Sequence, residues 1–137
     1  VYYGYMKQHI TPEQLKELSL KAKKKLWEWW TPKQGDLYYD KRDYGEVHVI
    51  KANVRSKSNR KGRILRIYPL LSIGQMIEFL DEQEHIQIEH RFYNPDSGHH
   101  GIWRVQGFGD KYFNEEEHLE LCDALWNAVK EVLESQP

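Results

Sequence analysis

Positive side chains are concentrated in one stretch of the chain, which carries the clearest chemical signal in the sequence. No acidic residue falls between positions 51 and 66, and the seven cations there are Lys51, Arg55, Lys57, Arg60, Lys61, Arg63 and Arg66. If each neutralised one phosphate, log affinity would fall with log salt by roughly 0.9 per contact. Tyr44 and Tyr68 lie nearby in the sequence and offer rings on which unpaired bases stack. This pattern predicts a nucleic-acid-binding hairpin.

The competing interpretation of the same segment is a solvated loop whose charge is offset elsewhere in the fold. The chain has 20 Lys and Arg against 21 Asp and Glu, a net charge of -1. Eight of the acids lie between positions 110 and 134, where the only basic residues are Lys111 and Lys130. Dedicated nucleic-acid-binding domains are usually strongly basic, so the overall balance favours the loop and leaves nucleic acid as the alternative function.

Three tryptophans, Trp27, Trp29 and Trp30, suggest a protein partner instead. Adjacent helical positions diverge by about 100°, so the three rings cannot all face one side, and at least one is expected to be partly exposed. An exposed Trp27 or Trp30 would anchor a partner protein, since aromatic side chains dominate interface energetics. In the competing interpretation the helix end packs under the strand that follows, and we expect this for two of the three rings.

The histidines do not have the spacing of a metal site. The sequence contains no CxxC, HxxxH or HExxH pattern. His99 and His100 with Asp96 would form only a surface site, and His90 is expected in the core because it shares one strand face with Ile86 and Ile88. We therefore expect no metal and no cofactor.

The candidate nucleophiles and carboxylates are explained by structure rather than by catalysis. Cys122 lies in an apolar helical stretch, where burial rather than reactivity is expected. Ser72 is placed to cap a helix. A metal-dependent enzyme using Asp40, Asp43 and Glu46 with Lys51 is the second alternative. The leading expectation is a non-enzymatic protein-interaction module.

The elements that hold these residues follow from caps and periodicity. Two capping boxes, Thr11 with Gln14 and Ser72 with Gln75, begin helices, the first spanning 12–30. A third helix is expected after Asn114, with Glu115, Glu116 and Glu117 in its first turn. Strands are expected at 37–40, 47–54, 63–68, 86–92 and 102–108, with 47–54 and 63–68 forming one hairpin and the last two another.

These elements predict an α+β fold of order α-β-β-β-α-β-β-α, with an antiparallel sheet of about five strands and three helices. Residues 1–10 are expected to be an N-terminal tail and residues 11–137 a single domain. The sequence lacks an apolar run of the roughly 18 residues that would span a bilayer, and its single cysteine cannot form an internal disulfide. A reducing cytoplasm is therefore expected.

Three motifs carry a resemblance to a known group: Trp30 to Tyr38 as W-x-P-x-x-G-D-x-Y, Pro69 to Leu80 as P-L-L-x-x-G-Q-x-I-E-x-L, and Ala124-Leu125-Trp126 in a C-terminal helix. In these the chain resembles small uncharacterised proteins encoded by phages and prophages of Firmicutes. The resemblance implies a phage-related protein in the host-cell cytoplasm and assigns no catalytic residue. The basic segment 51–66 lies outside the shared pattern. A dimer through sheet edges is compatible with the fold.

Overall fold

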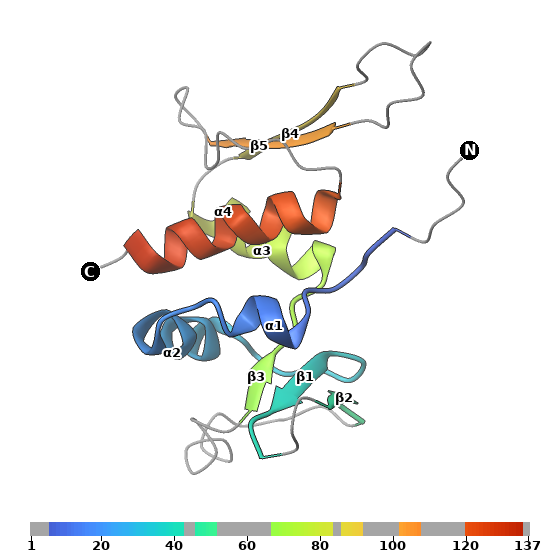
Figure 1. Ribbon diagram of the computed structural model, residues 1–137, viewed down its shortest axis with the longest axis vertical. Helices are drawn as coiled ribbons and strands as arrows, with labels where there is room; N and C mark the ends of the chain where they lie inside the picture. Colours follow the sequence, from blue (N-terminus) through green and yellow to red (C-terminus); the bar gives the residue numbers. More distant parts are fainter. Residues whose placement is uncertain are drawn as a thin grey trace. The chain divides into compact units, whose positions relative to one another are not determined.

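The computed structural model describes residues 6–42, 46–51, 67–83, 86–91, 102–107 and 120–135. Its elements are α1 (Pro12–Leu15), α2 (Leu20–Trp29), β1 (Leu37–Asp40), β2 (Val47–Val49), β3 (Ile67–Pro69), α3 (Ile73–Gln83), β4 (Ile86–Arg91), β5 (Ile102–Gly107) and α4 (Leu121–Ser135) (Figure 1). The predicted α+β class is confirmed. The five described strands belong to two antiparallel sheets, ordered β2-β1-β3 and β4-β5.

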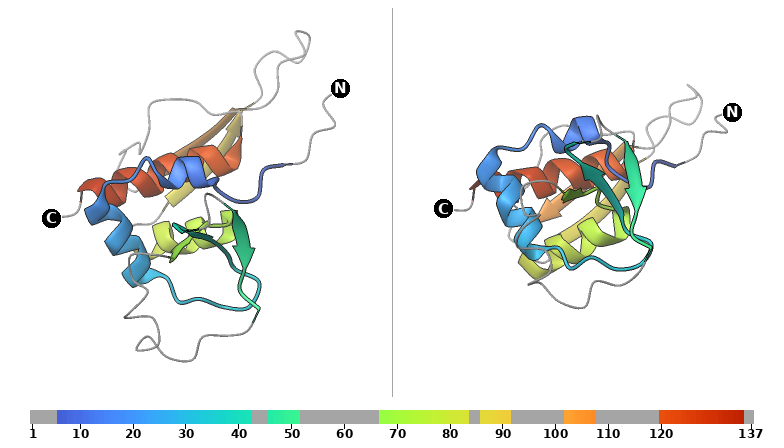
Figure 2. Two further views of the ribbon diagram at one scale, coloured as in Figure 1. Left: turned by 60° about the horizontal axis from the view of Figure 1, so that its bottom comes forward. Right: turned by 90° about the horizontal axis from the view of Figure 1, so that it is seen from below.

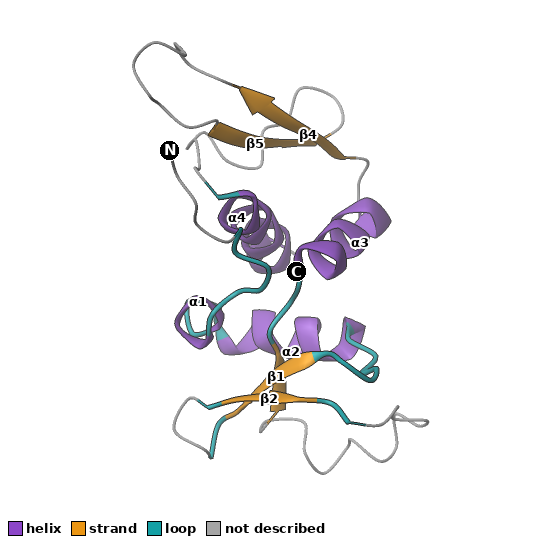
Figure 3. Cartoon of the chain, turned by 90° about the vertical axis from the view of Figure 1, so that its right-hand side faces the viewer, coloured by secondary structure: helices purple, strands orange, loops and turns teal. Residues whose placement is uncertain are grey.

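The described residues fall into two compact units, one drawn from Val1–His9 and Ser72–Val132 and the other from Ile10–Leu71 and Leu133–Pro137. The second unit contains α1, α2 and the three-stranded sheet. Figures 1 and 3 show both helices on the same side of that sheet. The expectation of one domain from residue 11 onward stays a prediction.

The helix expected at 12–30 is two helices. Its start is as predicted, because Thr11 Oγ1 accepts from the Gln14 N–H (3.1 Å) and Gln14 Oε1 accepts from the Thr11 N–H (3.0 Å). The first helix ends after one turn, and Ser19 caps a second, its Oγ accepting from the Ala22 N–H at 3.1 Å. The same hydroxyl donates to Glu134 at 2.6 Å. A polar residue inside an apolar stripe therefore starts a new helix.

The prediction that strands 47–54 and 63–68 pair with each other in a hairpin is wrong. β1 lies between the two neighbouring strands, and Tyr39 pairs with Val47 on one side and with Tyr68 on the other. The alternating pattern identifies strands but does not say which strands pair, so it could not place β1 at the centre. The turn before β1 uses Gly35 at φ 93°, in the left-handed region that favours glycine.

The first unit contains α3, the β4–β5 hairpin and α4 as far as Val132, whereas residues 133–135 of α4 belong to the second unit. The predicted antiparallel pairing of this hairpin is confirmed, with Ile86 opposite Gly107 and Arg91 opposite Ile102 (Figure 2). The box at the start of α3 is also confirmed, since Ser72 Oγ accepts from the Gln75 N–H at 3.1 Å. α3 and α4 lie side by side (Figures 1 and 3). The cap expected at Asn114 lies outside the described residues.

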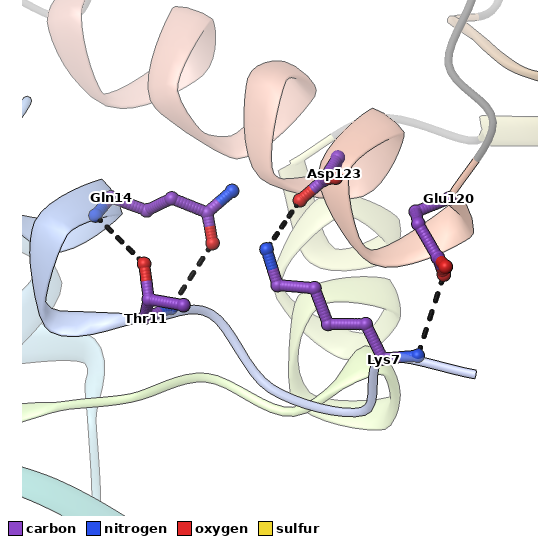
Figure 4. A network of polar contacts seen from close by, with 5 residues as sticks. All are labelled: Lys7, Thr11, Gln14, Glu120 and Asp123. Atoms are coloured by element: carbon purple, nitrogen blue, oxygen red, sulfur yellow. Dashed lines mark hydrogen bonds and ion pairs between the residues drawn. The ribbon is translucent and has the colours of Figure 1, made fainter. Parts of the chain in front are cut away.

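The described part of the expected N-terminal tail is bonded within this unit. His9 forms an isolated bridge with Ser72. Lys7 Nζ lies 2.6 Å from Asp123 Oδ1, and the Lys7 N–H donates to Glu120 Oε2 at 3.4 Å (Figure 4). These contacts attach the segment before α1 to the start of α4.

Candidate anion-binding site

A hollow of about 180 Å³ lies between the helices and the three-stranded sheet of the second unit. Leu15, Lys16, Leu20, Lys23, Tyr39, Lys41 and Tyr68 line it. Tyr39 and Tyr68 are direct cross-strand partners, so their side chains lie side by side on one face of the sheet. The helices α1 and α2 lie on this sheet face, and their residues complete the wall.

Three lysines give the hollow its charge. Lys16, the C-cap of α1, holds its ammonium 5.6 Å from the Tyr39 ring centroid, and Lys23 of α2 holds its ammonium 5.8 Å from that of Tyr68. Each such cation–π contact contributes about 0.5–1 kcal/mol at a partly exposed site. Lys41 directly follows β1. Among the described residues, no acid forms an ion pair with any of the three.

Asp40, the acid that precedes Lys41 in the sequence, faces away from the hollow. Asp40 alternates with Tyr39 along β1, so its side chain is on the opposite sheet face. Asp40 is 5% exposed, and its Oδ1 accepts from the Arg42 N–H at 3.0 Å. The lining thus carries three positive charges and no negative one, which suits an anion.

The rings of Tyr39 and Tyr68 are buried, and this changes the role expected for Tyr68. Tyr39 is 8% and Tyr68 5% exposed. The expectation that Tyr68 is a platform for base stacking is wrong, because Lys23 lies over its ring; Tyr44 lies outside the described residues. Burial raises the pKa of the Tyr68 hydroxyl above its ordinary value of 10.0, so this group remains protonated beside a bound anion.

Only one residue of the predicted cationic segment is described. Lys51 is exposed, two residues beyond β2. The other six, Arg55, Lys57, Arg60, Lys61, Arg63 and Arg66, lie outside the described residues. The sequence did not single out Lys16, Lys23 or Lys41, and the first two lie on either side of the break at Ser19 rather than on one helix.

The exposure expected of the tryptophan anchors is not found. Trp27 is 7% and Trp30 2% exposed, so both belong to the core. Trp30 Nε1 donates to Asp36 Oδ2 at 3.1 Å, which satisfies the buried indole. Trp29 is half-buried, in agreement with the expectation that one ring is partly exposed. The helix end therefore packs, and neither Trp27 nor Trp30 offers a surface to a partner.

The prediction that His90 lies in the core is also wrong. His90 is exposed and stacks on its cross-strand partner Trp103, with ring centroids 4.2 Å apart and an interplanar angle of 11°. The hairpin face is not buried at this end, so the alternating pattern overstated its burial. His99, His100 and Asp96 lie outside the described residues, and within the described ranges no three His, Cys, Asp or Glu side chains are grouped as metal ligands.

The remaining chemical candidates have structural roles where they are described. Cys122 is fully buried, as predicted, and burial raises the pKa of its thiol to about 11 despite the opposing charge of Lys7. Ser72 caps α3. Asp43 lies outside the described residues, and Glu46 is exposed while Asp40 is buried, so no carboxylate pair is seen there.

No protein-family model, no curated protein and no solved structure matches this chain. In the part of the chain that the structure describes, no helix combines the length and apolar character needed to cross a membrane. The lysine-lined hollow is therefore the feature of this chain that bears on its function.

Proposed function

We propose that this protein is a non-enzymatic module that binds single-stranded nucleic acid through its phosphates, without reading the bases. The observation that carries the proposal is the convergence of Lys16, Lys23 and Lys41 on one hollow whose lining contains no acid. Lysine ammonium groups bind phosphate as point charges, and the covered Tyr39 and Tyr68 rings leave no platform for a base. A flexible single strand can present one phosphate to such a hollow.

The basic segment 51–66 supports the same proposal. It begins at Lys51, after β2, and ends at Arg66, directly before β3, the strand that carries Tyr68. The chain therefore connects this segment to the strand that forms one wall of the hollow. A strand of nucleic acid that contacts both would cover more phosphates than the hollow alone.

Fluorescence anisotropy with a labelled single strand of about 12 nucleotides tests the proposal. The combined variant Lys16→Ala, Lys23→Ala, Lys41→Ala should bind more weakly and lower the log–log salt slope by about 0.7, since the three lysines together neutralise the one phosphate that enters the hollow. Lys24→Ala is the matched control, because Lys24 is exposed on α2 and outside the hollow. No binding by the intact protein at low salt would refute the proposal.

A protein partner is the second candidate, favoured by the rim of the three-stranded sheet. β2 is the last described strand on one side, and its Val47 and Val49 are 50% and 49% exposed. Apolar side chains on an edge strand favour pairing with another chain. A protein captured by the intact chain and lost with Val49→Lys supports this candidate, and an unchanged set of captured proteins contradicts it.

The cellular setting is a further part of the proposal. We place the protein in the cytoplasm of a host cell and in a phage-related process. The support is the resemblance of the stretches Trp30 to Tyr38 and Pro69 to Leu80 to phage and prophage proteins. Expression of the gene on induction of a prophage would support this setting, and constant expression before and after induction would contradict it.

A further inference from the structure

Two lysine ammonium groups lie over neighbouring tyrosine rings, which the register of the sheet places side by side. Tyr39 and Tyr68 are opposite each other on β1 and β3, and each ring lies below one lysine, Lys16 or Lys23. Neighbouring cross-strand side chains have Cβ atoms about 4.5–5.5 Å apart. Two positive charges therefore lie over neighbouring rings, and the lining of the hollow contains no acid.

The amount of charge indicates which anion fits. An internal phosphodiester of a nucleic acid carries one negative charge, whereas a phosphate monoester carries about -1.5 to -2 near pH 7. Three lysines in the lining match the monoester better, because each of its oxygens can accept from a different lysine. The neutral hydroxyl of Tyr68 adds no competing negative charge.

The size and apolar parts of the hollow indicate what the monoester is attached to. A volume of about 180 Å³ is below the roughly 300–1,000 Å³ of typical small-molecule pockets, so the hollow suits a phosphate and its first sugar atoms rather than a run of stacked nucleotides. Leu15 and Leu20 supply apolar wall beside the lysines, and Leu20 is 68% exposed. A strand end can enter a hollow of this kind without the rest of the strand following.

We infer that the hollow binds the terminal phosphate monoester of a single nucleic-acid strand, with Lys16, Lys23 and Lys41 donating to its oxygens. This inference rests on the proposed nucleic-acid-binding function and adds to it a preference for phosphorylated ends. The preference for phosphorylated ends is assigned to the hollow alone.

The test compares one oligonucleotide in three forms: with a 5′-phosphate, with a 3′-phosphate and with hydroxyls at both ends. A phosphorylated form should bind about tenfold more tightly than the unphosphorylated form, equivalent to one additional charge-assisted hydrogen bond. Lys16→Ala and Lys23→Ala should each reduce that ratio toward one, and Lys24→Ala should leave it unchanged. Circular dichroism verifies that each variant is folded.

A pH titration gives a second readout that a structural role of the lysines would not produce. The second pKa of a monoester is about 6, so the ratio should fall as the pH is lowered from about 7.5 to about 5.5. Equal binding of all three forms would overturn the inference while the proposed function stands. Absence of binding to every form would refute both. Tighter binding of a phosphoserine peptide than of the phosphorylated strand would assign the hollow to a different macromolecule and overturn the inference.

Discussion

Replacement of Asp36 by alanine tests whether Trp30 is a structural residue. Asp36 Oδ2 accepts from Trp30 Nε1 at 3.1 Å and from the Lys33 N–H at 3.0 Å, while the Asp36 carbonyl accepts from the Ile50 N–H at 2.8 Å. The carboxylate thus fixes the turn before β1 and satisfies a buried indole. Trp30 is 2% exposed, so water does not replace this partner.

The expected cost can be estimated from these two side-chain bonds. Loss of the partner of a buried donor costs about 1–3 kcal/mol, whereas the exposed amide of Lys33 regains water and loses less. We expect Asp36→Ala to lower the free energy of unfolding by about 2–3 kcal/mol. Asp36→Asn retains a carbonyl oxygen that can accept the indole N–H, and should cost about 1 kcal/mol.

A double-mutant cycle with Trp30→Phe isolates the contact. Urea unfolding followed by circular dichroism gives the free energies, and phenylalanine removes the indole N–H while keeping a ring. Asp36→Ala should cost about 1–2 kcal/mol less in the Trp30→Phe background than in the wild type. An equal cost in both backgrounds, or a total cost under about 0.5 kcal/mol, would refute the assignment of Trp30 to the core.

Three further predictions concern other parts of the two units. Gly35→Ala should destabilise by about 1 kcal/mol in urea unfolding, because φ is 93° while a Cβ would meet no atom within 4 Å, and Gly35→Asn should cost less. Ser19→Ala should cost about 1 kcal/mol through loss of the α2 cap, and Glu134→Gln, which keeps an acceptor, should cost less; equal losses would contradict the geometry. Because the pKa of Cys122 rises from 9.0 to about 11 on folding, the unfolded thiol ionises first as the pH rises. Stability should therefore fall between about pH 9 and 11, and less in Cys122→Ala, measured by chemical unfolding across that range.

The helix starts could be predicted because they depend on residues close together in the sequence. Features that depend on long-range contacts could not be predicted in the same way. The boxes at Thr11 and Ser72 involve residues three positions apart, so the sequence contains the whole interaction. The break at Ser19 was missed because the apolar spacing continues across it. One contact of this serine is with Glu134, 115 positions away, which no local pattern indicates.

Sheet pairing and burial were predicted less well for the same reason. The period-two pattern located β4 and β5 and their antiparallel pairing, yet it placed His90 in the core although the ring is exposed on the hairpin. The three tryptophans were correctly expected to diverge, but helical spacing does not say which face is covered. Trp30 is buried because the turn at Asp36 folds back onto it.

The hollow could not be found from the sequence because its walls come from separate segments. Lys16 and Lys23 lie on either side of the break at Ser19, and the tyrosines below them are brought together only by the pairing of β1 with β3. A prediction that paired 47–54 with 63–68 separates Tyr39 from Tyr68. Because the predicted strand order was wrong, the hollow could not be predicted from the sequence.

The near-neutral charge of the chain does not argue against a cationic site. At physiological salt the Debye length is about 8 Å, so exposed charges farther away are largely screened. The potential in the hollow is set by the groups within that distance, which include three lysines in its lining. Asp40, the acid next to Lys41 in sequence, lies on the opposite sheet face beside Arg42. A net charge of -1 thus coexists with a local site for an anion, and salt dependence measured with and without the three lysines tests that local charge directly.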